Sequence, residues 1–331
     1  MAVTPEVELP QLTGLARRSR ELEKLRRKAR RRVARIWLVA LAAAAALYLA
    51  SGPLLGAGGR FAMLAAVFAL VVWGLIQTQA ATQPYREAYK RELLEPLVQA
   101  VLPGFRHQPQ AGMGEEAFLA SRLFPSRPDR YASEDLFSGE VAGVPLRFAE
   151  VHAQEEREDC DDDGCRTHHT TIFRGLFAVA EFHKAFEGAV LVYPDRSERL
   201  LGALAQGWQR LGARSRRLQL IRLEDPRFER FFVVFADDPV TARYVLTPRL
   251  MEALVAYRER YGPVYASMID GALYLALPVR ADAFEPPPLW RGAVDQRRLR
   301  RHAGLLQAMR AIVTGLGMDV RLWGERARPE W

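Results

Sequence analysis

Two apolar stretches decide the fold of this chain: IWLVALAAAAALYLASGPLLG at residues 36–56 and FAMLAAVFALVVWGLIQTQAA at residues 61–81. Neither contains a charged residue, and each would be about 30 Å long as a helix, the thickness of the hydrocarbon core of a bilayer. Only a few residues separate them, so they predict a hairpin of two membrane-spanning helices. Two buried core helices are the alternative, but uncharged runs of this length rarely follow one another in soluble cores. A cleaved signal peptide is disfavoured, because a second span follows at once.

The positive charge of the chain is concentrated in front of the first span. The 331 residues carry a formal net charge of +8, and residues 1–35, with eleven basic and four acidic side chains, supply +7 of it. We expect this segment to continue the first span as a helix whose basic side chains contact anionic lipid, an attraction of about 1 kcal/mol per well-placed cation. The expected lipid-binding residues are Arg26, Arg27, Lys28, Arg30, Arg31, Arg32 and Arg35. Setting topology alone is the simpler interpretation, and nucleic-acid binding is disfavoured because the basicity is one local block.

The flanks of the spans predict their orientation. The basic block precedes the first span, Arg86, Lys90 and Arg91 follow the second, and the connecting loop carries only Arg60. The positive-inside rule therefore places both termini in the cytoplasm. Only four of the 47 basic residues are lysines, which suggests a GC-rich bacterial genome and hence a multi-pass protein of the bacterial inner membrane.

The rest of the chain predicts an α+β fold, with a mainly antiparallel sheet and flanking helices. Hairpin turns are expected at Ala142-Gly143 and Asp270-Gly271, and a helix capped by Thr247 should begin at Pro248. The expected order is a basic segment (1–35), a helical hairpin (36–82), a stalk helix and linker (83–112) and a cytoplasmic domain (113–331), with a soft boundary near 195–215.

Several phrases resemble one bacterial family. They are RYASEDLFSGEVAGVPLRFAEVHAQ, TTIFRGLFAVAEFHKAFEGAVLVYPD, FERFFVVFADDPVTARYVLTPRLMEALVAY and SMIDGALYLAL, with FRGLF at Phe173 to Phe177 the most specific. Their order is similar to that of the family called domain of unknown function 3137, over roughly residues 83 to 315. The resemblance implies two membrane spans before a cytoplasmic domain and, more weakly, a LemA-type membrane protein as partner. It implies no activity and no catalytic residues.

The chain lacks the motifs of several enzyme classes. We find no phosphate loop, no dinucleotide-binding glycine pattern, no nucleophile elbow and no H-E-x-x-H zinc motif. Glu150 and His152 would share one face of a strand and form a conceivable general base, although alternation brings any such pair together. A membrane-tethered hydrolase is therefore kept as an alternative function.

The stretch EREDCDDDGCRTHHT at residues 156–170 gathers potential metal ligands. Two thiolates and an imidazole could hold zinc, and D-x-D-x-D-G is half of a calcium loop that lacks its closing glutamate. A small disulfide loop is a third interpretation, disfavoured by a reducing cytoplasm. A plain polar hairpin connection is the fourth and the one that we favour. The residues of a metal site would be Cys160, Cys165, His168, Asp161 and Asp163.

From the sequence we expect a non-catalytic, membrane-anchored binding or scaffold module with no cofactor. Its partners would be anionic lipids and a membrane or cytoplasmic protein. A metal-responsive membrane protein is the remaining alternative, and it depends on the 156–170 stretch.

Overall fold

The computed structural model describes residues 15–51, 57–161, 164–181, 188–194, 218–279 and 284–317. They form two compact units, one made of residues 1–97 with 284–301 and one of residues 98–283 with 302–331. The predicted domain boundaries differ from this division, because a segment far along the chain returns to the helices of the first unit. The predicted soft boundary near 195–215 lies outside the described residues.

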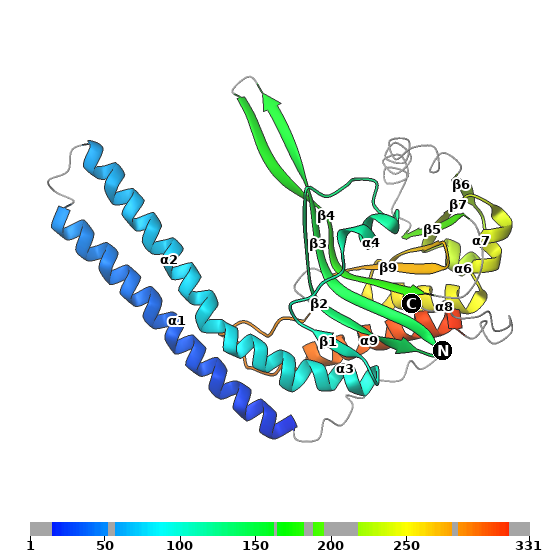
Figure 1. The fold of residues 1–331 in the computed structure, drawn as a ribbon, viewed down its shortest axis with the longest axis horizontal. Helices are drawn as coiled ribbons and strands as arrows, with labels where there is room; N and C mark the ends of the chain where they lie inside the picture. Colours follow the sequence, from blue (N-terminus) through cyan, green and yellow to red (C-terminus); the bar gives the residue numbers. More distant parts are fainter. Residues whose placement is uncertain are drawn as a thin grey trace, which may run out of the picture. The chain divides into compact units, whose positions relative to one another are not determined.

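The first unit is built on two long antiparallel helices (Figure 1). Helix α1 spans Leu15–Ser51 and helix α2 spans Ala57–Tyr89. Five residues of π-helix, Lys90–Leu94, then lead into α3, Glu95–Val101, so the predicted stalk is continuous with the second apolar segment. Both helices are long and apolar enough to cross a membrane, and only 6% of each apolar window is buried.

The second unit contains one nine-stranded sheet. Its order is β1-β2-β3-β4-β9-β8-β5-β7-β6, and every neighbouring pair is antiparallel. The strands are β1 (Arg106–Gln108), β2 (Arg130–Val141), β3 (Val144–Asp161), β4 (Gly164–Glu181), β5 (Ala189–Pro194), β6 (Gln219–Ile221), β7 (Phe232–Ala236), β8 (Tyr265–Ile269) and β9 (Ala272–Pro278). The α+β class and the antiparallel sheet are therefore confirmed.

Both predicted hairpin turns are present and have the expected geometry. Ala142 and Gly143 have φ of 53° and 82°, and Asp270 and Gly271 have φ of 50° and 78°. Two successive positive φ values are those of a type I′ turn, whose twist matches that of the flanking strands. These turns join β2 to β3 and β8 to β9.

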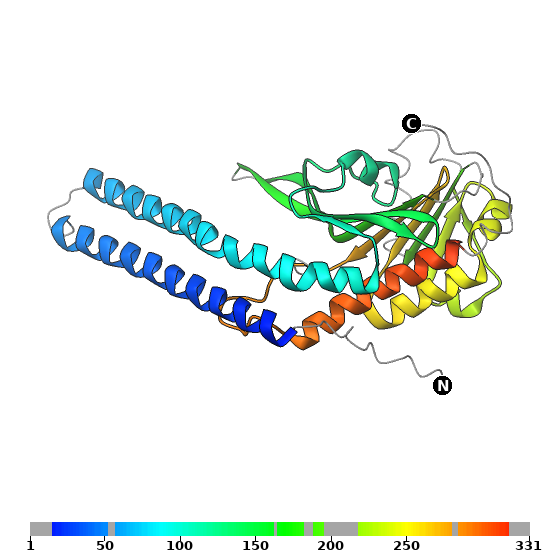
Figure 2. The same ribbon diagram turned by 60° about the horizontal axis from the view of Figure 1, so that its bottom comes forward.

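Short helices and two longer ones cover the sheet. They are α4 (Glu115–Ala120), α6 (Pro226–Glu229), α7 (Pro239–Val245), α8 (Pro248–Tyr261) and α9 (Gln296–Gly317). The Thr247 hydroxyl accepts a hydrogen bond from the Leu250 amide at 3.3 Å, so the predicted cap of α8 is confirmed. Helix α8 and the later part of α9 lie on one face of the sheet and α4 lies on the other (Figure 2).

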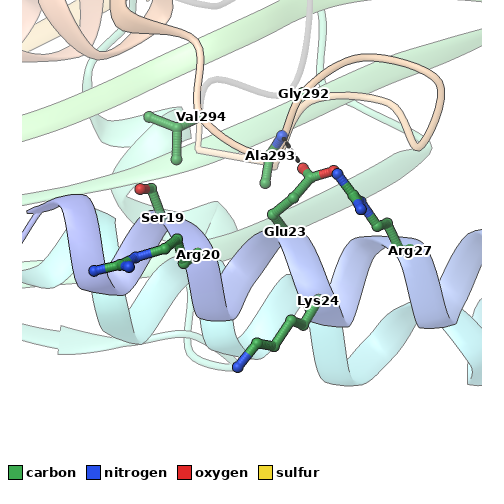
Figure 3. Close-up of a pocket in the computed structure, with 8 residues that line it drawn as sticks. All are labelled: Ser19, Arg20, Glu23, Lys24, Arg27, Gly292, Ala293 and Val294. Atoms are coloured by element: carbon green, nitrogen blue, oxygen red, sulfur yellow. Dashed lines mark hydrogen bonds and ion pairs between the residues drawn. The ribbon is translucent and has the colours of Figure 1, made fainter.

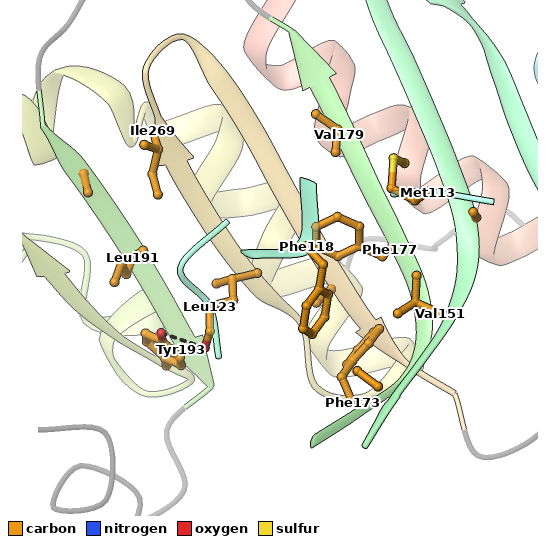
Figure 4. Packing of buried hydrophobic residues seen from close by; sticks show 14 residues of the cluster. Met113, Phe118, Leu123, Val151, Phe173, Phe177, Val179, Leu191, Tyr193 and Ile269 are labelled. Atoms are coloured by element: carbon orange, nitrogen blue, oxygen red, sulfur yellow. Dashed lines mark hydrogen bonds between the residues drawn. The ribbon is translucent and has the colours of Figure 1, made fainter. Parts of the chain in front are cut away.

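Helix α4 seals its face of the sheet with aromatic side chains (Figure 4). The Phe118 ring lies 5.0 Å from that of Phe124, 5.5 Å from that of Phe177 and 6.1 Å from that of Phe173. Phe118 and Phe177 are almost fully buried. Aromatic pairs at these separations stabilise a core beyond their buried area, so this cluster anchors α4.

The FRGLF phrase has a structural explanation. Gly175 has a φ of 156°, and a Cβ atom there would lie 2.1 Å from the carbonyl oxygen of Leu277. The close approach lets the Val279 amide donate to the Arg174 carbonyl at 3.1 Å, where β4 and β9 part. Only glycine fits this crossing of two backbones.

Candidate functional site

Helix α1 has two opposite faces with different chemistry. The buried face follows the 4-3-4-3-4 spacing of a coiled-coil seam and contains Leu22, Arg26, Ala29, Val33, Ile36 and Ala40, all buried or half-buried. At 3.6 residues per turn, the opposite face contains the cation stripe, which we define as Arg17, Arg20, Lys24, Lys28, Arg31 and Arg35, all exposed. The cation stripe therefore faces away from α2.

The face that bears the cation stripe becomes apolar after Arg35. Beyond Arg35, the next residues on this face are Leu38, Ala42, Ala45 and Leu49, all exposed. Leu38 is 65% exposed and Leu49 is 76% exposed. Exposed side chains on this face therefore change from charged to apolar within one turn of a single helix.

The cations of α1 differ in how they are neutralised. Lys24 lies 2.9 Å from Glu21, and Glu23 binds both Arg26 and Arg27. We call the five cations nearest the apolar segment the inner cations: Lys28, Arg30, Arg31, Arg32 and Arg35. None of these five forms an ion pair with another described residue. The inner cations therefore lack an ion-pair partner among the described residues, whereas Lys24, Arg26 and Arg27 further out on α1 each have one.

Six of the cations surround an open hollow of about 450 Å³ on α1. This cationic hollow is lined by Lys24, Arg27, Lys28, Arg31, Arg32 and Arg35. No acidic residue lines it. A surface that gathers guanidinium and ammonium groups without acids favours phosphate or carboxylate ligands.

A second hollow, of about 530 Å³, lies between α1 and a segment that returns from the end of the sheet (Figure 3). We call this returning segment, residues 284–301, the strap. Glu23 extends from α1 to the strap and accepts a hydrogen bond from the Ala293 amide at 3.2 Å. Arg26 donates to the Leu289 carbonyl. These contacts fix the strap on the outer part of α1.

The ion pairs around Glu23 perturb its acidity. Hydrogen bonds from Arg26, and then from Arg27 and the Ala293 amide, lower the pKa of Glu23 to about 2. Arg26 is only 7% exposed, and both its partners belong to the protein. The predicted lipid-binding role of Arg26 therefore conflicts with its position, whereas the other six predicted residues are exposed.

The strap is also fixed to α2 and the π-helix. Glu285 of the strap lies 3.2 Å from Lys90 and 3.3 Å from Arg86. Lys90 is 8% exposed and opens the π-helix, and burial raises the pKa of the neighbouring Tyr89 to about 12. Sequence reasoning missed the strap, because EPPPLWRGAV has neither helical nor strand periodicity.

The predicted metal residues lie on a projecting ribbon of two strands. Strands β3 and β4 continue beyond Gln154, the last residue of β3 to pair with β2, to the pair Asp161 and Gly164 (Figure 1). The described part of the 156–170 stretch is therefore strand. Asp163 lies outside the described residues.

The ribbon does not bring the predicted ligands together. Cys165 is disulfide-bonded, and Cys160, the only other cysteine, is its partner in the strand register. Cys165 and His168 are three residues apart on one regular strand, so they lie on opposite faces. Asp161 belongs to a paired strand as well, which is no calcium loop. One ion bound by both Cys165 and His168 would require a different ribbon.

Glu150 and His152 share a face of β3, as alternation predicts. They lie opposite Leu176 and Arg174 of β4, and both are half-buried. The two hollows described above lie elsewhere, on α1. Neither hollow therefore supports the hydrolase alternative, because neither is lined by Glu150 or His152.

The comparisons with known proteins agree with the sequence resemblance. A family described as protein of unknown function (DUF3137) matches residues 171–318. The chain resembles this family. The matched part contains FRGLF and SMIDGALYLAL, whereas the phrases before residue 171 lie outside it. No curated protein matches the sequence.

One solved structure resembles the chain weakly. It is the crystal structure of the mycobacterial trehalose monomycolate transport factor A, TtfA, with 12% sequence identity and a TM-score of 0.29. The match covers 62% of this chain and 88% of the other. A superposition of this quality does not establish a shared fold.

Proposed function

We propose that the protein is a membrane-anchored scaffold that spans a bacterial inner membrane with α1 and α2. The inner cations would contact anionic lipid, and both termini would lie in the cytoplasm. The sheet unit would bind a membrane or cytoplasmic protein, for which a LemA-type protein is the partner suggested by the family resemblance. The observation that carries the proposal is the single face of α1 that changes from exposed cations to exposed apolar side chains.

Distances along α1 support a lipid contact for the inner cations. With a rise of 1.5 Å per residue, Lys28 lies about 10 Å and Arg35 directly at the start of the apolar segment. Headgroup layers are about 5–8 Å thick, and the Debye length at physiological salt is about 8 Å. The inner cations are therefore within reach of lipid charge, whereas Arg17 is about 27 Å away. We leave Arg26 out of the lipid-facing set because it is buried.

Tryptic cleavage of the full-length protein in nanodiscs tests the lipid contact. Anionic phosphatidylglycerol should slow cleavage after Arg30, Arg31, Arg32 and Arg35 by about tenfold relative to phosphatidylcholine, because bound headgroups cover these side chains. Cleavage after Arg17 and Arg20 is the internal control and should change less than about twofold. Equal rates at the inner cations in both lipids would overturn the lipid contact.

The disulfide offers a test of orientation. Disulfides are rare in a reducing cytoplasm. The structure has Cys165 in a disulfide, whereas the proposed orientation predicts that both cysteines are free thiols in cells. Under the proposal, a membrane-permeant maleimide should label Cys160 and Cys165 in intact cells without added reductant. Thiols that react only after reduction, together with labelling by an impermeant reagent after reduction, would place the sheet unit outside the cytoplasm.

A further inference from the structure

The ribbon of β3 and β4 has two edges that no other described strand covers (Figure 1). Strand β3 pairs with β2 only as far as Gln154, and β4 pairs with β9 only from Gly175 onward. The strands at the margins of the sheet, β1 and β6, have three residues each. An uncovered edge exposes backbone N–H and C=O groups with which another extended chain can pair. The ribbon therefore offers longer edges than either margin of the sheet does.

The outer edge of β3 is protected against such pairing. Residues 155–161 carry five acidic side chains and one arginine. The carboxylate of Asp129 accepts a hydrogen bond from the Glu156 amide at 2.7 Å, and the Asp129 amide donates to the Gln154 carbonyl at 2.9 Å. Charged side chains and a covering loop are two devices by which proteins keep edge strands from pairing. The β3 side of the ribbon is therefore covered at its base and charged along its length.

Within the part of the chain that the structure describes, the outer edge of β4 lacks both devices. We call residues 164–171, GCRTHHTT, the β4 edge; it contains no acidic residue and a single arginine. The side chains from Cys165 to His169 are exposed. Three of its residues are threonines, which favour the extended backbone of a strand. The β4 edge is therefore open and already in the conformation that accepts a further strand.

The ladder shows which backbone groups of the β4 edge point outward. The Glu156 amide points away from β4 to Asp129, so Glu156 and His169 form a pair of the ladder without hydrogen bonds to each other. The N–H and C=O groups of His169 therefore point outward as well. By the alternation of the ladder, so do those of Thr167 and Thr171.

The charge of the β4 edge indicates the chemistry of the strand that it fits. Arg166 and, beyond the edge, Arg174 are the charged residues of β4 before Gly175, and both are basic. Opposite charges on neighbouring strands stabilise a sheet, whereas like charges destabilise it. A second β4 edge would bring two basic strands together, and the acidic β3 edge of a second copy is covered by Asp129. An extended acidic segment of a different protein is complementary.

We propose that the β4 edge binds an extended acidic segment of another protein, which adds a strand to the ribbon. In this mode of recognition, backbone hydrogen bonds provide affinity and side chains provide specificity. The disulfide of Cys165 holds the ribbon in its paired form, which lowers the cost of ordering it on binding. This inference rests on the proposed function, since it specifies where the sheet unit binds its protein partner.

The test uses synthetic peptides and the full-length protein in phosphatidylcholine nanodiscs. A fluorescein-labelled peptide of alternating valine and glutamate should bind at least about tenfold more tightly than one of alternating valine and lysine. N-methylation of the amides of the glutamate peptide should weaken its binding at least about tenfold, because strand addition needs these groups. Residue-resolved hydrogen exchange should show the bound peptide slowing the amides of Thr167, His169 and Thr171. The amides of Arg166 and His168, which point to β3, should change little.

Variants separate the two edges of the ribbon. His169→Pro removes an outward N–H of the β4 edge and should weaken the glutamate peptide at least about tenfold. Glu158→Pro, the matched control, removes an outward N–H of β3 and should leave binding unchanged. Arg166→Glu should reduce the preference for glutamate over lysine to less than about threefold. Its control, Arg222→Glu, makes the same charge change at an exposed residue beside β6. Circular dichroism with gel filtration checks that each variant folds.

The outcomes distinguish this inference from the proposed function. A peptide that slows exchange on α1 or β3 but not at Thr167 and His169 would overturn the inference, and so would equal binding of both peptides. Slowing of the same amides without peptide, as protein concentration rises, would show that a second copy occupies the β4 edge and would overturn the acidic partner. Neither result affects the lipid-dependent tryptic cleavage of α1. Loss of that lipid dependence, with the peptide still bound at the β4 edge, would overturn the lipid contact and leave this inference.

Discussion

Helices α1 and α9 are both rich in leucine and arginine, but the apolar side chains of α9 are buried whereas many of those of α1 are exposed. In α9, Leu306 and Met309 are fully buried, whereas in α1 Leu41 and Leu49 are 70% and 76% exposed. Helix α9 covers a sheet that supplies an apolar partner surface. The apolar part of helix α1 packs against α2, which covers one narrow seam. The same residue types therefore indicate a soluble core in one helix and an apolar surrounding in the other.

The comparison predicts a large difference between apolar truncations in the two units. Phe118→Ala, in the sheet unit, should lower the free energy of unfolding by about 3–5 kcal/mol, because it removes a buried ring and leaves a cavity. Leu41→Ala on the exposed face of α1 is the control and should change it by less than about 0.5 kcal/mol. Urea unfolding in mild detergent, followed by circular dichroism, measures both. Equal losses would mean that the exposed face of α1 is covered by protein.

A glycine substitution tests how closely the strands of the sheet unit approach. Gly175→Ala should cost about 3 kcal/mol, because the new methyl group meets the Leu277 carbonyl and the backbone must move. Gly114→Ala is the matched control, since a Cβ atom there meets nothing within 4 Å. The same unfolding measurement applies. A neutral Gly175 variant would show that β4 and β9 are further apart at this crossing.

The ribbon at the end of β3 and β4 depends on pairing and on its disulfide, not on a core. Cys165→Ser should destabilise the ribbon by about 2 kcal/mol, the entropy of closing a six-residue ring. Hydrogen exchange should quicken at the amides of Arg166 to Thr170, while amides of β5 in the buried sheet keep their rates. Faster exchange throughout the sheet would contradict an independent ribbon.

The attachment of the strap to α1 should depend on pH. The pKa of Glu23 is lowered when folded, so its contribution is present above its unfolded pKa of about 4.5 and is lost as pH falls towards 2. After allowance for solvent screening, the contribution is about 1 kcal/mol. Glu23→Gln should therefore lower the protection factor of the Ala293 amide at neutral pH and remove the pH dependence of that protection factor between 4.5 and 2. Glu21→Gln, at an exposed position of the same helix, is the control and should leave this amide unchanged.

The smallest effect is expected within the apolar part of the helix pair. The Trp37 indole donates to the Thr78 hydroxyl at 3.1 Å, and its ring lies beside Gly74 of α2. Thr78→Val should cost about 0.6 kcal/mol, as hydrogen bonds between membrane helices do. Thr82→Val is the control, because that hydroxyl bonds only to carbonyls of its own helix. Unfolding by sodium dodecyl sulfate from bicelles compares the two variants.

Local signals in the sequence predicted much of the fold. The uncharged stretches, the paired turn residues at Asp270 and Gly271 and the cap at Thr247 each act within a few neighbours, so the sequence reveals them directly. The ribbon was interpreted as a loop, because polar strands exposed on both faces lack an alternating apolar pattern. That both sides of the ribbon are strands is evident only from their backbone pairing in the structure.

The candidate site was predicted in part. The basic block was evident from charge alone, and six of the seven expected lipid-binding residues are exposed. The burial of Arg26 could not be foreseen, because its partner carbonyl belongs to Leu289, 263 positions further along the chain. The metal site depended on ligands close in sequence, but strand alternation separates Cys165 from His168.

The strap sets an order on biosynthesis. Residues 98–283, an interval of 186 residues, separate the two parts of the helical unit, so the strap partners of Glu23 and Lys90 are synthesised only after this interval. During that interval, Lys90 and Arg26 have no access to Glu285 and the Leu289 carbonyl. A nascent chain that ends before the strap therefore lacks these contacts. Formation of the strap contacts therefore requires that residues 98–283 have already been synthesised.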